Sequence, residues 1–468
     1  MLIPHLNSYI SFYLKYPEKC EQQLMLMKQE QQLMLMKQEQ QYIQPKQLGI
    51  YCWKSVDDDI PIAALGDIHG DIEALISALK AGNLIELNQS KTKWLWKGGN
   101  THLVILGDMV DRWREPMMNK NIVPHSVGEI VREEEIIQEF LNNLRKQATI
   151  VGGKIIKLAG NHEVMNVKGI FNTVSPFALQ NQGGKEKRKQ SFNSGGEMYK
   201  LLTDNWQDFH AIARVGRWIF VHGGFTLSLL KYIKPNSSRL DIDDIITEIN
   251  TKFREGMLTG IFDENWFGPP DSSKPGSILW DRSQGNPVTA KRHDIVCGDF
   301  KELARIIGKQ DLKLAVAHCN QLMNITRESK YFVPEISTAM EKDRTVHKLK
   351  LSGGKVEPYL CTESKSECQP GITYICPDDQ GVGNIWRIDV AMSRSFDDIE
   401  KNVKFLSGNN DPEILKHFSS RRPQLLLTSA DADPNLIQVC KSTTDLPRNT
   451  KCPLEQPCQN CQRINNLG

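Results

Sequence analysis

The sequence predicts an α/β fold, in which a layered or sandwiched β-sheet core is flanked by helices. From about residue 48 to 398, short apolar runs alternate with amphipathic segments, as strands and helices do in layered α/β proteins. Three glycine-containing motifs with carboxylate, imidazole and carboxamide groups each close one of these apolar runs. Because open sheets present ligand groups at one edge, we expect these polar side chains to meet at the ends of neighbouring strands.

Seven apolar runs are expected to form strands, and two amphipathic segments are expected to form helices. Five of the strands precede polar groups and cover residues 61–65, 102–106, 154–158, 217–221 and 313–317. Two closing strands are expected at 372–376 and 385–390. The helices are expected at 71–81 and 132–146, where apolar residues recur at helical spacing.

Changes in composition divide the chain into three parts. These are an N-terminal extension at 1–47, a central domain at 48–398 and a polar, cysteine-containing C-terminal tail at 399–468. Within the extension, residues 21–29 recur unchanged at 30–38. A nine-residue period at ~100° per residue turns the second Leu-Met cluster to the opposite side, which disfavours a coiled coil. The repeat is interpreted as a solvated extension or, alternatively, as a Met-rich segment that binds a partner.

The overall composition is that of an ordinary globular protein. The 468 residues are 40% hydrophobic and 24% charged, with a net charge of +2, which does not indicate a nucleic-acid partner. No apolar run approaches the ~18 residues of a membrane-spanning helix, and the N-terminus lacks the pattern of a cleaved signal peptide. Eleven scattered cysteines are more typical of reduced thiols than of a disulfide framework. Together these features predict a cytoplasmic location.

Two further segments leave alternatives open. Residues 183–190 are basic and open with two glycines, so we expect a flexible surface excursion that is not buried. Such a loop is either simply solvated or recruits acidic partners. In the tail, four cysteines either form a structural zinc site or remain free, because only the last two have the tight two-residue spacing. They are Cys440, Cys452, Cys458 and Cys461.

The residues that follow the apolar runs are of the types that bind divalent metal ions. Carboxylate and amide oxygens and imidazole nitrogens are the usual donors to such ions. A single Gly-Asp turn, or one His after an apolar run, is usually structural. Six suitable donors at comparable positions instead predict a site for two ions. The donors are Asp67, His69, Asp108, Asn161, His222 and His318.

The same motifs resemble those of a known family. Gly66-Asp67-Ile68-His69-Gly70, Gly107-Asp108-Met109-Val110-Asp111-Arg112, Gly160-Asn161-His162-Glu163, His222-Gly223-Gly224 and the final His318 resemble the phosphoprotein phosphatases, within the calcineurin-like metallophosphoesterases. The segments 160–166, 279–282 and 386–393 resemble the bacterial-type branch called Shewanella-like phosphatases. The resemblance covers about residues 60 to 395. It implies a calcineurin-like β-sandwich flanked by helices, with added N- and C-terminal extensions.

The resemblance also implies how the metal ions are held. Asp67, His69 and Asp108 would bind one ion, and Asp108, Asn161, His222 and His318 the other, with Asp108 as the bridge. Because the set contains no thiolate, manganese, iron or zinc fits better than a soft metal. Manganese is the first choice, with iron or zinc as alternatives. Two ions ~3.5 to 4 Å apart can share a hydroxide and direct it at phosphorus.

The catalytic roles implied by the resemblance fall on four residues. His162 would protonate the leaving group, and Asp111 would orient its imidazole. Arg112 and Arg282 would bind phosphoryl oxygens, and Asn161 would also contact the substrate. Trp113 stands where the family usually has glycine, which places a bulky ring beside the expected phosphate site.

The expected function is hydrolysis of phosphoserine and phosphothreonine monoesters in a phosphoprotein substrate, by direct attack of a metal-bridging hydroxide. Three alternatives remain open: a protein-tyrosine phosphatase, a dinucleoside polyphosphate hydrolase or phosphodiesterase, and an inactive binding scaffold. No nucleic acid and no membrane span are expected, and the sequence does not indicate an oligomeric state. The branch implies a bacterial source, and export into a host cell without a cleaved leader is a further hypothesis.

Overall fold

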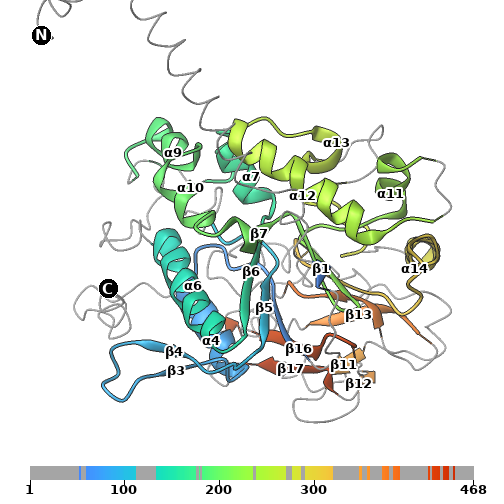
Figure 1. Ribbon diagram of the computed structural model, residues 1–468, viewed down its shortest axis with the longest axis horizontal. Helices are drawn as coiled ribbons and strands as arrows, with labels where there is room; N and C mark the ends of the chain where they lie inside the picture. The colour runs from blue at the N-terminus through green and yellow to red at the C-terminus, as the bar shows by residue number, and fades with distance from the viewer. Residues whose placement is uncertain are drawn as a thin grey trace, which may run out of the picture. The chain divides into compact units, whose positions relative to one another are not determined.

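The computed structural model divides the chain into two compact units, Met1–Ile50 and Tyr51–Gly468. All the residues that the structure describes belong to the second unit (Figure 1). They are residues 60–111, 133–174, 179, 182–235, 239–269, 277–285, 290–319, 372–378, 383–389, 424–432 and 436–441, with short strands at 52–53, 347–349, 356–358, 420–421 and 446–447. The nine-residue repeat, Arg112, Trp113 and the last three cysteines lie outside these ranges.

One six-stranded sheet carries the three glycine motifs. Its order is β17 (Gln438–Lys441), β16 (Gln424–Ser429), β2 (Pro61–Leu65), β5 (His102–Ile105), β6 (Lys154–Leu158) and β7 (Phe209–His210). Strands β2, β5, β6 and β7 run parallel to one another, whereas β16 runs antiparallel to β2. Parallel strands are covered on both faces, which explains why these runs are apolar without alternation.

A second six-stranded sheet carries the two later histidines. Its order is β1 (Cys52–Trp53), β8 (Ile212–Val215), β9 (Trp218–Val221), β10 (Lys313–Val316), β14 (Gly383–Arg387) and β13 (Thr373–Pro377). Strand β10 lies parallel between β9 and β14. The buried Trp218 ties the two sheets together, because its indole N–H donates to the carbonyl of Ser429 on β16 at 3.1 Å.

Helices cover both sheets (Figure 1). Helix α4 (Ile72–Ala81) contacts β16 and helix α6 (Glu133–Ile150) contacts β6, while α12 (Ile242–Thr259) contacts β8 and α14 (Ala290–Ile307) contacts β13. The Asp71 carboxylate caps α4 by accepting the N–H of Ala74 at 3.2 Å, which satisfies one of the free donors at a helix start.

The remaining elements are short. The helices are α7 (Asn161–Val167), α9 (Lys185–Phe192), α10 (Glu197–Leu202), α11 (Leu227–Ile233), α13 (Glu264–Phe267) and the 3-10 turn Trp206–Asp208. The strand pairs are β3 (Ile85–Leu87) with β4 (Trp94–Trp96), β11 (His347–Leu349) with β12 (Val356–Pro358), and β15 (Ser420–Arg421) with β18 (Leu446–Pro447).

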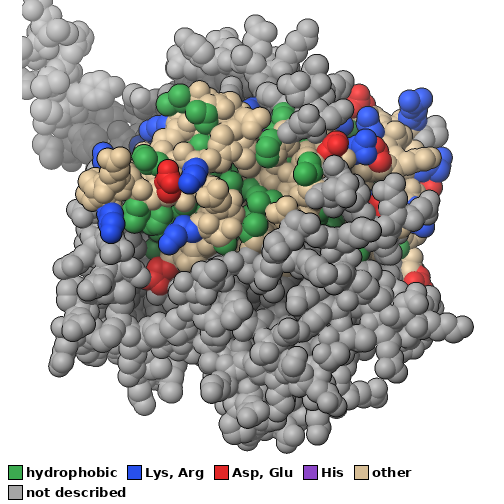
Figure 2. All heavy atoms as spheres, turned by 90° about the horizontal axis from the view of Figure 1, so that it is seen from below, with side chains coloured by type: hydrophobic (Ala, Val, Ile, Leu, Met, Phe, Trp, Pro, Cys, Tyr) green, Lys and Arg blue, Asp and Glu red, His purple; other side chains and the backbone are tan. Residues whose placement is uncertain are grey.

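The predicted α/β sandwich flanked by helices is confirmed. Each of the seven apolar runs forms a strand, and both predicted helices are present with bounds shifted by a few residues. None of the helices in the described ranges combines the length and apolar character needed to span a bilayer. Figure 2 shows basic and acidic side chains interspersed on one face, in keeping with the net charge of +2.

Residues 424–441, which sequence analysis placed in the C-terminal tail, contribute to the motif-bearing sheet. They form β16 and β17, and β16 pairs with β2 from Leu426 opposite Ala64 to Ser429 opposite Pro61. Leu425 and Leu426 are fully buried. Pairing between segments more than 350 positions apart leaves no local pattern in the sequence. The polar composition around residues 424–429 also made this apolar strand difficult to recognise.

The basic segment at 183–190 is not a flexible excursion, so that prediction is wrong. Residues Lys185–Phe192 form α9, and Arg188 is buried with 1% exposure. The remaining charged residues of this helix, such as Lys185 and Lys189, are exposed. One helix face therefore points inward although the segment contains little apolar surface.

The expectation of reduced cysteines is also wrong for one pair. Cys297 on α14 and Cys376 on β13 form a disulfide with a Cα separation of 5.2 Å. The packing of α14 against β13 brings these two distant positions together. In the described part of the chain, Cys319 and Cys440 are not in disulfides, and the proposed zinc site in the tail remains a prediction.

Candidate active site

The six predicted metal donors lie just beyond the carboxyl ends of strands from both sheets. In the motif-bearing sheet, Asp67 follows β2, Asp108 follows β5, and Asn161 follows β6 as the first residue of α7. In the other sheet, His222 directly follows β9 and His318 follows β10. Facing edges of the two sheets thus bring together donors that are far apart in the sequence.

Three of the donors, and the nearby Asp111, have backbone conformations that non-glycine residues rarely adopt. The φ angles of His69, Asp108, Asp111 and His318 are 45°, 49°, 64° and 61°. Each such residue costs on the order of 1 to 3 kcal/mol and persists when its surroundings hold it. The surrounding packing therefore fixes the side-chain directions at this edge.

Two motif glycines allow the β5 and β6 loops to approach each other. A Cβ atom at Gly107, whose φ is 97°, would collide with the backbone nitrogen of Gly160. A Cβ atom at Gly160 would in turn collide with the Asp108 carboxylate. A side chain at either position would block this close approach, so both positions require glycine.

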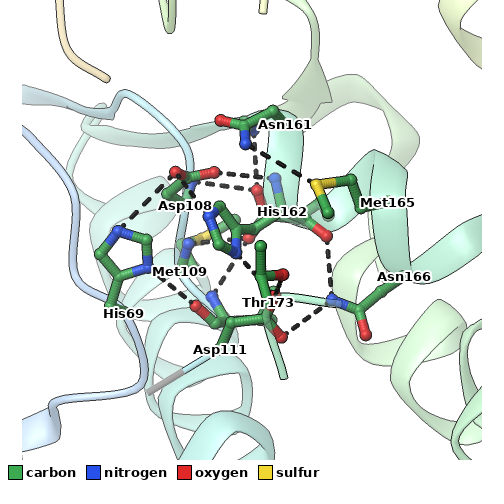
Figure 3. Close-up of polar contacts among 12 residues, drawn as sticks. His69, Asp108, Met109, Asp111, Asn161, His162, Met165, Asn166 and Thr173 are labelled. Atoms are coloured by element: carbon green, nitrogen blue, oxygen red, sulfur yellow. Dashed lines mark hydrogen bonds and ion pairs between the residues drawn. The ribbon is translucent and has the colours of Figure 1, made fainter. Parts of the chain in front are cut away.

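Asp108 faces several of the predicted donors, and Figure 3 shows it beside His69 and His162. Its Oδ2 atom is 3.3 Å from His222 Nε2, 3.7 Å from His69 Nε2 and 3.8 Å from His162 Nε2. Asp67 Oδ2 is 3.6 Å from His69 Nε2. Two groups of side chains have donor atoms that all lie within 4.8 Å of one another, and Asp108 belongs to both. They are His69, Asp108 and His162, and Asp108, His222 and His318.

Backbone carbonyls orient two of the imidazoles. His222 Nδ1 lies 2.7 Å from the carbonyl of Leu106, and His69 Nδ1 lies 3.1 Å from the carbonyl of Val110. A carbonyl only accepts, so Nδ1 carries the proton in each ring and Nε2 faces Asp108. This is how proteins commonly orient histidine ligands. The buried Nε2 of His318 has no hydrogen-bond partner among the described residues.

The charges in the site favour a bound cation. Burial, with the nearby carboxylates of Asp389 and Asp108, raises the pKa of Asp67 well above its usual value. Burial alone would raise the pKa of Asp108, but the surrounding imidazoles, chiefly His162 and His222, hold it well below its usual range. Burial alone would lower the pKa of His222, but Asp108 and Asp67 outweigh it and raise that pKa to about 9. The carboxylates of Asp67 and Asp108 therefore favour positive charge on the groups beside them, and such buried carboxylates are suited to binding divalent metal ions.

His162 is held by Asp111 on the side away from Asp108. Its Nδ1 atom donates to Asp111 Oδ2 at 2.6 Å, and its backbone N–H donates to Asp108 Oδ1 at 3.0 Å. Asn166 Nδ2 donates to Asp111 Oδ1 at 2.9 Å, and Thr173 Oγ1 to Oδ2 at 3.1 Å. The imidazole is therefore fixed with Nε2 directed toward the donor cluster (Figure 3).

Comparison with known proteins decides the family. The model of the family described as calcineurin-like phosphoesterase matches residues 60–302, which are 243 of the 468 residues. The chain belongs to the calcineurin-like phosphoesterase family. The family predicted from the motifs is thus confirmed.

The chain also resembles individual proteins. It is 30% identical to Shewanella-like protein phosphatase 1 of Plasmodium berghei over 266 residues, which are 56% of this chain and 61% of that protein. It is 34% identical to Shewanella-like protein phosphatase 2 of Arabidopsis thaliana over 119 residues, or 25% of each chain. The chain therefore spans less than two thirds of the length of these curated relatives.

A solved structure, the cold-active protein-tyrosine phosphatase of a psychrophilic Shewanella species, is similar over 82% of this chain and 80% of that chain. The TM-score is 0.42 and the sequence identity is 14%. Similarity at this level carries no argument about the substrate.

Glu163 joins two of the motif loops. Its Oε1 accepts the N–H groups of Met109 at 2.7 Å and Val110 at 3.2 Å, and its Oε2 accepts those of Gly160 at 2.7 Å and Asp108 at 3.0 Å. The side chain is fully buried. Burial and the nearby Asp108 raise the pKa of Glu163 to about 7, although the backbone donors oppose the rise.

Replacing Glu163 by glutamine should lower the free energy of unfolding by about 2 to 4 kcal/mol, because the amide group would face backbone donors that need an acceptor. Urea unfolding of the full chain measures the change. Glu255→Gln is the matched control, because Glu255 is exposed on α12. Equal stability of the two variants would show that Glu163 does not hold the loops together.

Of the two predicted phosphate-binding arginines, only Arg282 lies in the described part of the chain. Arg282 is exposed and lies close enough to His318 to affect its protonation. Burial, His222 and Arg282 together lower the pKa of His318. Arg112 follows Asp111 but lies outside the described residues, so its role remains a prediction.

Several residues that support the site were not predicted from the sequence. Glu163 and Asn166 are in segments used for the family resemblance, but neither was given a function. Arg188 is four residues before the buried Phe192, a helical spacing that could have indicated an inward face. Glu134 and Thr173 have no local signal, because only the fold places them beside Asp111.

Proposed function

We propose that this chain is a metal-dependent phosphoprotein phosphatase that hydrolyses phosphoserine and phosphothreonine monoesters. The observation that carries the proposal is the placement of Asp108, which faces the Nε2 atoms of His69, His162 and His222 at 3.3 to 3.8 Å. This arrangement combines donors for metal ions with an oriented imidazole next to them. Both are needed for hydrolysis of an ester with a basic leaving group.

The buried donors fit two divalent ions, with manganese as the first choice and iron or zinc as alternatives. One ion would be held by Asp67, His69 and Asp108, and the other by Asp108, Asn161, His222 and His318. The orphaned Nε2 of His318 and the carbonyl-oriented rings of His69 and His222 support this assignment. When bound, such ions supply positive charge that lowers the pKa of water and offsets charge on phosphoryl oxygens.

His162 is proposed to donate the proton that the leaving alkoxide needs. Asp111 accepts from Nδ1, so the opposite nitrogen, Nε2, is the one free to give a proton to the ester oxygen. Burial alone would raise the pKa of Asp111, but its hydrogen bond and ion pair with His162, and then Arg188, hold it well below its usual range. Asp111 therefore stays ionised and stabilises a cationic imidazole.

Substrate binding is proposed for Arg282, Arg112 and Asn161. The planar guanidinium of arginine presents paired donors that match phosphoryl oxygens. Arg282 is exposed, so its side chain is accessible to a phosphorylated segment of another protein. Asn161, on the first turn of α7, lies among the metal donors and can also contact a phosphoryl oxygen.

The experiment is a substrate panel with the purified full-length protein and manganese. It contains a chromogenic aryl phosphate, peptides with phosphoserine, phosphothreonine or phosphotyrosine, and a diadenosine polyphosphate. Fastest turnover of the phosphoserine and phosphothreonine peptides is expected. Preference for phosphotyrosine would make the protein a tyrosine phosphatase, and preference for the dinucleotide would place it outside the phosphomonoesterases. No turnover by protein that binds metal, measured by elemental analysis, would leave only the binding scaffold.

A further inference from the structure

Arg188 on α9 is buried beside the residues that orient His162. Its Nη2 atom donates to Asp111 Oδ1 at 2.7 Å and to Glu134 Oε2 at 3.1 Å. Its Nε atom donates to Asn166 Oδ1 at 2.5 Å, and Nη1 donates to Gln182. All three nitrogens of the guanidinium are therefore used, and each partner accepts through oxygen.

The charges in this cluster make Arg188 difficult to replace. Asp111 and Glu134 are both buried, with 1% and 7% exposure, and Arg188 lies between them. Burying two carboxylates without a cation is strongly unfavourable. The guanidinium therefore allows a second acidic residue to lie against Asp111.

The hydrogen bonds divide the two oxygens of Asp111 between different partners. Oδ1 accepts from Arg188 and Asn166, and Oδ2 accepts from His162 and Thr173. Rotation of the carboxylate would break bonds on both oxygens at once. Because Oδ1 is fixed by Arg188, Oδ2 remains aligned with His162 Nδ1.

The backbone of Asp111 is tied to the same cluster. Its N–H donates to Glu134 Oε1 at 2.8 Å, while Glu134 Oε2 accepts from Arg188. Asp111 has a φ angle of 64°, which a non-glycine residue adopts only under constraint. Glu134 and Arg188 thus hold both the main chain and the side chain of Asp111.

We propose that Arg188 is a positioning residue for protonation of the leaving group, acting through Asp111 on His162. This inference rests on the proposed proton-donor role of His162. A misplacement of about 1 Å in a catalytic group can cost roughly 100-fold in rate. Loss of Arg188 should therefore slow esters that need a proton on the leaving oxygen, and spare esters that do not.

A purely structural role predicts a different result. Arg188 also packs over the ring of Phe192, with 4.9 Å between its guanidinium carbon and the ring centroid, and so helps to anchor α9. If anchoring were its whole contribution, its loss would lower stability and slow all substrates by a similar factor. The dependence on the leaving group separates the two roles.

The experiment compares phenyl phosphate with 2,4-dinitrophenyl phosphate, using full-length Arg188→Met loaded with manganese. Phenolate is far more basic than dinitrophenolate, so its departure is assisted by a proton, whereas dinitrophenolate departs without one. The expected kcat falls roughly 10- to 100-fold for phenyl phosphate and less than about threefold for the dinitrophenyl ester, with little change in KM. Lys185→Ala removes an exposed charge from the same helix and should leave both rates unchanged. Equal losses on the two esters would overturn the proposal.

A second variant keeps the test decisive if Arg188→Met folds poorly. The double variant Arg188→Met/Glu134→Gln removes one positive and one negative charge, so the net charge of the buried cluster is unchanged. The glutamine oxygen can still accept the N–H of Asp111. Recovered thermal stability with a persistent defect on phenyl phosphate would support positioning. Recovery of both stability and turnover would show that Arg188 is structural.

His162→Ala separates this inference from the proposed function. A steep dependence on the leaving group in His162→Ala, without one in either Arg188 variant, would overturn the role of Arg188 alone. Absence of that dependence in His162→Ala would overturn the proton-donor assignment itself, and with it the role of Arg188.

Discussion

Replacing Asp108 by asparagine should lower the turnover of an aryl phosphate by roughly two orders of magnitude or more. Asparagine keeps the shape of the side chain, and its oxygen can still accept the backbone N–H of His162, which lies 3.0 Å from Asp108 Oδ1. It removes the negative charge that faces three imidazoles. Because Asp108 belongs to both donor groups, both should lose affinity for metal.

The metal content of the purified variant, measured by elemental analysis, reports this loss without relying on activity. Asp299→Asn is the matched control, because Asp299 is exposed on α14. The control should keep the metal content and rate of the parent protein. If Asp108→Asn retained both values as well, the central position assigned to Asp108 would be incorrect.

Replacing His162 by alanine should lower kcat for phenyl phosphate roughly 100- to 1,000-fold, the range expected for loss of a general acid. The metal content should stay that of the parent protein, because His162 is proposed to donate a proton rather than to bind metal. Steady-state kinetics and elemental analysis on the same preparation measure both quantities.

The His162–Asp111 pair provides an internal control. Asp111 is proposed to act through His162, so adding Asp111→Asn to His162→Ala should cause little further loss, as for residues that act as a unit. Loss of metal from His162→Ala would instead place His162 among the ligands. Its Nε2 lies in one donor group with His69 and Asp108, so the measurement distinguishes the two roles.

The strands and the donor cluster could be predicted because their signals are local. The strands β2, β5 and β6 are covered on both faces and appear as short apolar runs, and glycines such as Gly107 and Gly160 mark where the chain turns. Polar residues placed directly after parallel strands of one sheet gather at one edge of that sheet, although the sequence does not show that His222 and His318 belong to a second sheet facing it. Distance along the sequence does not weaken that inference, because it depends on strand ends alone.

The residues around Asp111 could not be predicted, because their partners lie far away in sequence. Arg188 is 77 positions from Asp111 and 54 positions from Glu134. In the sequence its neighbours are three lysines, one glutamate and one glutamine, so the segment has the composition of a solvated loop. Only the packing of α9 against α7 shows which one of these charges is buried.

The pairing of β16 with β2 determines where this protein can be shortened. A fragment ending near residue 398 would contain every predicted catalytic residue but would leave the backbone amides and carbonyls of β2 without their antiparallel neighbour. An uncovered strand edge is a template for another chain. Such a fragment should therefore self-associate in a recombinant preparation, and expression work should begin with boundaries that retain residues up to Lys441.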